Sequence, residues 1–318
     1  MILRPHEKLE LDFSKLMQIN YAVACNSGTA ALQLAMEALQ LPPGSEVIVP
    51  EFTMIACARA VSMAGLTPVF ADCNELLLID DKTAANAYSA KVRAIMPVHI
   101  YGRQCNMNSL HEFAKRRELA VIEDMSEIHG IKPHPDSVAA CWSFYRNKIV
   151  CGEEGGLTGF KYEEHAKLAR SLRCQGFTAE HDFLHVARGI NARLSDTHAS
   201  LILTSLDNLQ HNLAVRRQLE SLYDEYVPKK MHMPKRKVCW VYDVRLGANQ
   251  HINGVVQRIN KAGYAARHGF KPMSMQPEYS GAYSHLQAYA ASRNVMYLPV
   301  MPGMPEESVA EIASLVSA

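Results

Sequence analysis

The chain has 318 residues, of which 48% are apolar and 20% are charged, and its 33 basic residues nearly balance its 32 acidic ones. This length and apolar content suffice for one or two packed domains and exclude wholesale disorder. The net charge of +1 lacks the electrostatic footprint of a nucleic-acid-binding protein. No apolar run is long enough for a membrane span, and the N-terminus carries charges where a signal peptide needs an apolar stretch. We therefore expect a cytoplasmic protein that binds neither nucleic acid nor membrane.

Between residues 20 and 160, short apolar runs alternate with helical patterns. The runs are rich in Val, Ile and Ala and lack polar alternation, which is typical of strands buried on both faces of a mostly parallel sheet. They span residues 21–25, 46–49, 68–71, 92–98, 119–122 and 139–144. Amphipathic helical patterns lie between them, for example at 29–39 and 108–119. This order predicts a three-layer α/β domain.

The C-terminal part is organised differently. Residues 194–226 form one long helical pattern, which we interpret as a connecting helix between two domains. Beyond it, strand-like runs at 238–245, 263–267 and 296–299 accompany helix-like runs at 250–261 and 305–316. The sequence thus predicts a large domain over residues 1–228 and a smaller α+β domain over residues 229–318.

The eight cysteines and 14 histidines do not form metal or redox motifs. No two cysteines make a CxxC spacing, and several lie within apolar strand-like runs. Without a secretory signal they are expected to be reduced core residues. No histidine spacing indicates a metal, and His99 is expected to be a structural histidine.

Three short segments could carry chemistry. The first is NSGTAA, residues 26–31, between a strand and a helix. Gly28 would let the backbone approach an anion closely, and the N–H groups at the start of the helix would bind it. The same letters are also an ordinary helix N-cap, and the sequence alone does not separate the two interpretations.

The second and third segments are VIEDMSE, residues 121–127, and SFYRNK, residues 143–148. Asp124 ends a buried strand at the edge where open α/β sheets bind ligands, so it could cap a helix or face a cationic ring nitrogen. Lys148 follows another strand; a lysine that loses hydration becomes nucleophilic towards aldehydes, although a lone lysine is usually a solvated surface residue. A phosphate-binding helix start, a carboxylate that faces a ring nitrogen and a nucleophilic lysine are together the groups that hold pyridoxal phosphate (PLP).

Six ordered blocks, together with the C-terminal runs, resemble the DegT/DnrJ/EryC1/StrS sugar aminotransferases. They are SGTAAL, VIVPEFTMIACARAVSMAGLTPVFAD, IMPVHIYGR, VIEDMSEIHG, SFYRNKIVCGEEGG and GINARLSD, and the resemblance runs over nearly the whole chain. It implies a fold-type I PLP-dependent transferase that moves an amino group from L-glutamate to a nucleotide-linked keto sugar. It also implies a homodimer with active sites at the subunit interface.

The resemblance further implies roles for individual residues. Lys148 would bond covalently to the cofactor and carry protons, and Asp124 would hold the pyridine nitrogen protonated. Gly28, Thr29 and Ser143 would hold the phosphate, with Asn191 reaching the phosphate of the neighbouring subunit. The remaining cofactor contacts would be Glu127, near the phenolic oxygen, and Met54, where the family usually has an aromatic ring. Candidate substrate contacts at the pocket mouth are Arg193, Arg267, Phe270 and Lys271, although surface solvation is the default for the charged ones.

Within the family, Asn147-Lys148-Ile149 and Glu127 are most similar to enzymes that aminate C4 of a 4-keto-6-deoxyhexose, such as perosamine synthases. A 3-aminotransferase and a regulatory protein on a retired enzyme scaffold remain alternatives. A related 3-dehydratase branch has histidine in place of the lysine, so Lys148 argues against it. The sequence also departs from the family at Glu153, where a small residue is usual, and in its short N-terminal lead-in.

Overall fold

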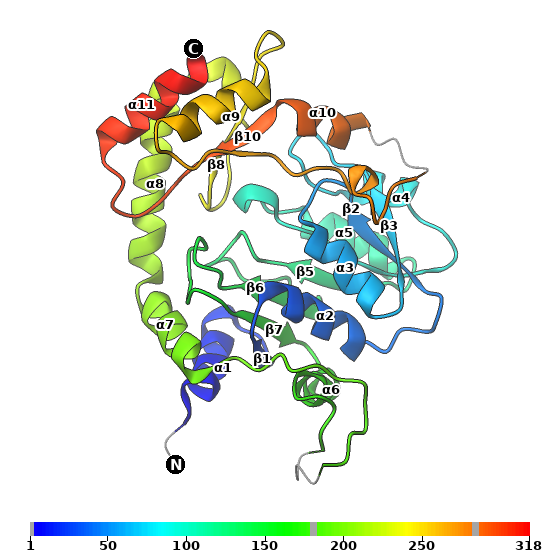
Figure 1. Cartoon of the computed structure of the whole chain (residues 1–318). Helices are drawn as coiled ribbons and strands as arrows, with labels where there is room; N and C mark the ends of the chain where they lie inside the picture. The colour runs from blue at the N-terminus through cyan, green and yellow to red at the C-terminus, as the bar shows by residue number, and fades with distance from the viewer. Residues whose placement is uncertain (1–2, 179–182, 282–285) are drawn as a thin grey trace.

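The computed structural model describes residues 3–178, 183–281 and 286–318, and Figure 1 shows a large sheet with helices on both sides and a smaller C-terminal lobe. The large sheet has seven strands in the order β1-β7-β6-β5-β4-β2-β3. Their bounds are β1 (Tyr21–Cys25), β2 (Glu46–Pro50), β3 (Thr67–Ala71), β4 (Val92–Ile95), β5 (Ala120–Asp124), β6 (Ala139–Ser143) and β7 (Gly156–Phe160). Only β7 runs antiparallel to its neighbours. The predicted mostly parallel α/β sheet is confirmed.

The strand β7 was not among the predicted strands. Its sequence, GLTGF, contains two glycines, which weaken strand propensity. The glycine is needed at Gly156, because a Cβ there would lie 2.2 Å from the carbonyl oxygen of Ser27. This close approach places the turn before β7 directly beside the start of α2 (Gly28–Ala38).

In the described residues up to Asp207, the structure has seven α-helices. They are α1 (Pro5–Met17), α2 (Gly28–Ala38), α3 (Ile55–Met63), α4 (Asp81–Asn86), α5 (Met107–Lys115), α6 (Glu163–Arg173) and α7 (Asp196–Asp207). The helix α2 packs on β6 and β7 and also against α3 and α6. Its small and apolar residues are buried almost all round, which fits a helix enclosed between layers.

The predicted single helix over residues 194–226 is wrong: the structure has two helices, α7 and α8 (Leu209–Tyr226). The break lies at Asn208, whose side-chain amide donates to the carbonyl of Thr204 at 2.9 Å. Its backbone N–H bonds to Leu206 instead of continuing the helix. An asparagine side chain that replaces a backbone donor is a recognised reason for a helix to end.

The C-terminal lobe has its own sheet and its own core. Its three antiparallel strands, in the order β8-β10-β9, are β8 (Tyr242–Arg245), β9 (Arg267–His268) and β10 (Val295–Leu298). The helices are α9 (Ile252–Lys261), α10 (Leu286–Asn294) and α11 (Glu306–Ser317). Figure 1 shows α8 running from the large domain up to α9 and α11, and its later residues Leu219 and Tyr223 join the C-terminal core. The predicted boundary after residue 228 stays a prediction, since α8 contributes to both cores.

A buried ion network joins the two lobes. Arg103, which follows β4, donates to Asp243 on β8 at 2.8 Å, and Arg236 donates to the same carboxylate oxygen at 2.6 Å. All three side chains are at most 3% exposed. The lobes are therefore held in one arrangement at the level of β4 and β8.

Two further expectations from the sequence concern the cysteines and membrane-spanning helices. All eight cysteines are described and carry free thiols; six are buried, as expected for core residues, whereas Cys151 and Cys174 are only partly buried. Within residues 3–178, 183–281 and 286–318, no helix is both long and apolar enough to cross a bilayer.

Candidate active site

A cavity of about 460 Å³ lies at the carboxyl ends of β1, β2, β5 and β6 and is closed on one side by the C-terminal lobe. This is the edge of an open α/β sheet where ligands bind. Eight of the twelve predicted site residues line it: Gly28, Thr29, Met54, Asp124, Glu127, Ser143, Lys148 and Phe270. Segments distant in sequence are thus brought to one place by the parallel strands.

The start of α2 forms one end of this cavity. The side chain of Ser27 accepts the backbone N–H of Ala30 at 3.1 Å, so Ser27 is indeed an N-cap. The N–H groups of Gly28 and Thr29 have no acceptor within their own helix and lie at its positive dipole end. A Cβ on Gly28 would lie 2.6 Å from the Cβ of Ser143, so glycine is needed where β6 ends against α2. The two interpretations of this segment are compatible, since the cap and the anion seat use different N–H groups.

Asp124 lies on the floor of the cavity and is 5% exposed. Its Oδ1 accepts the backbone N–H of Ser126 at 2.9 Å, and its Oδ2 accepts the thiol of Cys57, on α3, at 3.2 Å. No helix follows directly, so the N-cap interpretation of Asp124 is wrong. The two donors fix the orientation of the carboxylate from both sides.

Lys148 is not a solvated surface lysine. Its Nζ lies 3.7 Å from the ring centroid of Trp240, a residue of the C-terminal part of the chain. Burial lowers the pKa of Lys148, and the negative charge of Glu127 partly opposes this shift. A buried amine with a lowered pKa is more often neutral and hence nucleophilic.

The turn that carries Lys148 is held by its own backbone. The N–H of Lys148 donates to Tyr145 at 2.8 Å, and the N–H of Arg146 donates to Glu153 at 3.1 Å. Glu153 adopts a φ of +67°, in the left-handed region that favours glycine. This conformation gives a physical reason for the small residue that the resembling family usually has there.

Glu127 is 6% exposed and lines the same cavity. Its Oε2 accepts the backbone N–H of Tyr101 at 2.6 Å. Burial raises the pKa of Glu127 to about 7, although the positive charge of Lys148 acts in the opposite direction. The carboxyl group can therefore exchange a proton near neutral pH.

Four predicted residues are not among the described residues that line the cavity. The side chains of Asn191, Arg193, Arg267 and Lys271 are all exposed. Arg193 lines a separate groove beside α6, and Lys271 lines a hollow at the start of α9. Their predicted roles as contacts to a partner subunit or to substrate stay predictions.

The buried histidines have internal partners. His99 is fully buried, with Nδ1 accepting the backbone N–H of Cys105 at 3.1 Å and Nε2 lying 3.0 Å from Glu123. Both ring nitrogens of His99 therefore have partners inside the protein. This arrangement is that of a structural histidine.

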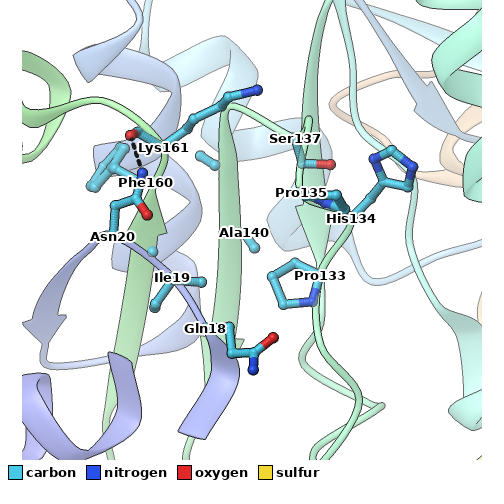
Figure 2. A pocket seen from close by; sticks show the side chains of 12 residues that line it. Gln18, Ile19, Asn20, Pro133, His134, Pro135, Ser137, Ala140, Phe160 and Lys161 are labelled. Carbon is cyan, nitrogen blue, oxygen red and sulfur yellow. Dashed lines mark hydrogen bonds between the residues drawn. The ribbon is translucent and has the colours of Figure 1, made fainter. Parts of the chain in front are cut away.

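A second cavity lies at the opposite end of β6 and β7, and Figure 2 shows its lining. Its volume is about 50 Å³, and the side-chain amide of Asn20 closes one wall by donating to the carbonyl of Lys161 at 2.9 Å. A space of this size holds little more than water. The cavity at the carboxyl ends of the strands is the candidate active site, because it brings together Asp124, Lys148 and the start of α2.

Sequence reasoning missed several residues that line or support this site. Trp240 and Tyr297 reach it from the C-terminal lobe, and Tyr145 from the turn before Lys148. Cys57 was interpreted only as a core residue, yet its thiol contacts Asp124. The rarity of tryptophan, with two in the chain, was a signal that could have drawn attention to Trp240.

The residues fit PLP. Helix N–H groups without an acceptor in their own helix and the hydroxyl of Ser143 lie at one end of the cavity, where Gly28 lets the end of β6 pack against the start of α2. A buried carboxylate with both oxygens oriented can bind a protonated ring nitrogen, and a half-buried lysine can bond to an aldehyde. A cavity of about 460 Å³ is within the usual range for small-molecule sites.

Comparisons with known proteins agree with this geometry. The model of the DegT/DnrJ/EryC1/StrS aminotransferase family matches residues 4–317. GDP-perosamine synthase of Caulobacter vibrioides is 32% identical, over 95% of this chain and 86% of that protein. UDP-N-acetyl-3-dehydro-alpha-D-glucosamine 3-aminotransferase of Acidithiobacillus ferrooxidans is 30% identical, over 97% and 86%. The crystal structure of S. venezuelae DesV superposes with a TM-score of 0.89 at 27% identity, covering 99% of this chain and 89% of that one.

Proposed function

This chain belongs to the DegT/DnrJ/EryC1/StrS aminotransferase family, and we propose that it transfers the amino group of L-glutamate to C4 of a nucleotide-linked 4-keto-6-deoxyhexose. Membership makes it a PLP-dependent transaminase that acts on sugar nucleotides. The finer assignment rests on the 32% identity to a GDP-perosamine synthase over almost the whole chain. Glu127 and the Asn147-Lys148-Ile149 turn favour the same branch.

The cofactor phosphate is assigned to the start of α2. The N–H groups of Gly28 and Thr29 and the hydroxyl of Ser143 are the donors, and the helix dipole adds positive potential. We assign Asn191 to the phosphate of a neighbouring subunit, because its side chain is exposed and outside its own cavity. The active enzyme is then a homodimer.

The ring of the cofactor is assigned to Asp124. Its carboxylate, oriented by Cys57 and Ser126, would accept a hydrogen bond from the ring nitrogen and keep that nitrogen protonated. When bound, PLP supplies an electron sink for the carbon that gains or loses the amino group. Met54 and Glu127 line the same cavity, and Glu127 would lie beside the ring substituents.

Lys148 is assigned both the covalent attachment and the proton transfers. In the first half-reaction its Nζ takes a proton from Cα of glutamate, and in the second it delivers a proton to the sugar carbon that receives nitrogen. A lowered pKa suits both steps, since the amine must be neutral to accept a proton and charged to donate one. One amine serving two half-reactions in one cavity predicts ping-pong kinetics.

The experiment is a substrate panel with purified protein, PLP and L-glutamate. GDP-, dTDP- and UDP-linked 4-keto-6-deoxyhexoses are compared with 3-keto sugar nucleotides, and the products are identified by mass and NMR. We expect 2-oxoglutarate and a 4-amino sugar, and no product with Lys148→Ala. Turnover of 3-keto sugars alone would overturn the C4 assignment. The second candidate, 3-amination, is favoured by the 30% identity to the Acidithiobacillus 3-aminotransferase.

A further inference from the structure

One of the contacts between the two lobes lies inside the cavity, where Lys148 lies against Trp240. The lysine comes from the turn after β6, and the tryptophan precedes β8 in the C-terminal lobe. Nζ lies 3.7 Å from the centroid of the indole ring, and Trp240 is 5% exposed. Lys148 is half-buried, and indole is the ring whose face attracts an ammonium group most strongly.

Trp240 is itself held rigidly. Its indole N–H donates to the carbonyl of Asn147 at 2.9 Å, the residue directly before Lys148. Arg216 of α8, which is 4% exposed, donates to the carbonyl of Trp240 at 2.7 Å and to that of Val300 at 2.7 Å. One side chain therefore contacts both the amine of Lys148 and the peptide that precedes it.

We propose that Trp240 is a positioning residue for Lys148: its ring face holds the amine in the cavity, and its N–H fixes the turn that carries the amine. This inference rests on the role proposed above for Lys148. It adds a contribution from the C-terminal lobe to a site whose other predicted groups come mainly from the large domain. The lobe arrangement thereby sets the position and the charge of the amine.

Trp240 also affects the protonation of the Lys148 amine, because burial and the indole ring shift its pKa in opposite directions. Burial lowers the pKa of Lys148. The indole face acts in the other direction, because a ring quadrupole stabilises only the protonated amine. The other charged or titratable groups that face Lys148 come from α3, the end of β5, the segment after β5, and α8, and they are Cys57, Asp124, Glu127, His129 and Arg216. These charged groups are kept when Trp240 alone is substituted. A change in the pKa of Lys148 in such a variant therefore reports the effect of the indole ring.

The test measures how fast cofactor-free, full-length protein captures PLP at a series of pH values. Borohydride is added after timed intervals, and the label on the Lys148 peptide is measured by mass. Capture requires the neutral amine, so its rate rises through the pKa of Lys148. For Trp240→Leu we expect the midpoint to move down by about 0.5 to 1.5 pH units, the size of a cation–π contact. Trp240→Phe keeps a weaker ring face and is expected to move less.

Tyr145→Leu is the matched control, because Tyr145 also lines the cavity but its ring faces Arg146 at 5.2 Å. Its midpoint should equal that of the wild type. An unchanged midpoint in Trp240→Leu, with only the maximal rate altered, would overturn the proposal. If Trp240→Leu does not fold, the comparison of wild type with Trp240→Phe decides in the same way. Equal labelling of Lys148→Ala would instead overturn the proposed function, since the anchor would then be another residue.

Discussion

Replacing Gly28 by alanine tests the phosphate seat at the start of α2. The added Cβ would lie 2.6 Å from the Cβ of Ser143 and 3.0 Å from its Oγ, whereas ordinary contact begins at 3.4 Å. Gly28 has an ordinary negative φ, so the effect comes from contact and not from backbone strain. Either α2 or the end of β6 must move, and both carry groups assigned to the phosphate.

Overpacking of this kind costs about 1–3 kcal/mol. If the free energy of PLP binding is weakened by this amount, the dissociation constant for PLP rises between about five- and 150-fold. The assay is titration of cofactor-free Gly28→Ala with PLP, followed by the visible absorption of the bound cofactor. Thermal unfolding of the same samples separates loss of binding from loss of folding.

A second glycine provides the matched control. Gly254 lies within α9, and a Cβ there would meet nothing within 4 Å. Gly254→Ala should leave the PLP affinity unchanged and stabilise the fold by about 0.5–1 kcal/mol. Wild-type affinity in Gly28→Ala would refute the assignment of the phosphate to this helix start.

Three further outcomes are expected. Cys57→Ala removes a hydrogen-bond donor to Asp124 and should weaken PLP binding about two- to tenfold. Cys57→Ser keeps a donor and should restore the affinity. Equal loss of affinity in both variants would contradict a hydrogen-bonding role. Burial raises the pKa of Glu127 to about 7, so the folded cofactor-free protein binds a proton that the unfolded chain releases near pH 4.5. Its free energy of unfolding, measured in urea, should therefore fall as the pH rises from about 4.5 to 7, and Glu127→Gln should flatten this fall. Asp243→Asn leaves the buried Arg103 without a counter-charge and Arg236 with Glu220 alone, and should cost about 3–5 kcal/mol in the same assay, with a loss under 1 kcal/mol refuting a stabilising role for the network.

The wild-type protein should lose the stabilisation from Asp243 on acidification. Burial by itself would raise the pKa of this carboxyl, but the guanidinium groups of Arg103 and Arg236 hold it below its ordinary value. The stabilisation is therefore complete above the unfolded-state pKa and falls away as the pH drops below about 4. Urea unfolding at pH 5 and pH 3 measures it, and an Asp243→Asn variant with the same acid dependence as wild type would contradict this assignment.

Much of the large domain could be predicted from the sequence because its signals are local. Apolar runs without alternation indicated buried parallel strands, and β1 begins and ends where the pattern placed it. Asp124 was found because it ends a strand and Lys148 because it follows one, and parallel strands carry the residues at their carboxyl ends to one edge. The break at Asn208 was missed because a side chain there competes for a backbone carbonyl, which helical periodicity does not reveal.

The sequence by itself determined the fold class, the family and the set of groups that could hold a cofactor, since each depends on short segments read in order. Only the tertiary structure decided what surrounds those groups. The thiol of Cys57 on Asp124 and the indole of Trp240 on Lys148 join residues 67 and 92 positions apart, and neither contact has a sequence signature. The physical reason is that burial and orientation, which set the charge of Lys148 and Glu127, depend on how two lobes pack and not on the residues beside them in the chain.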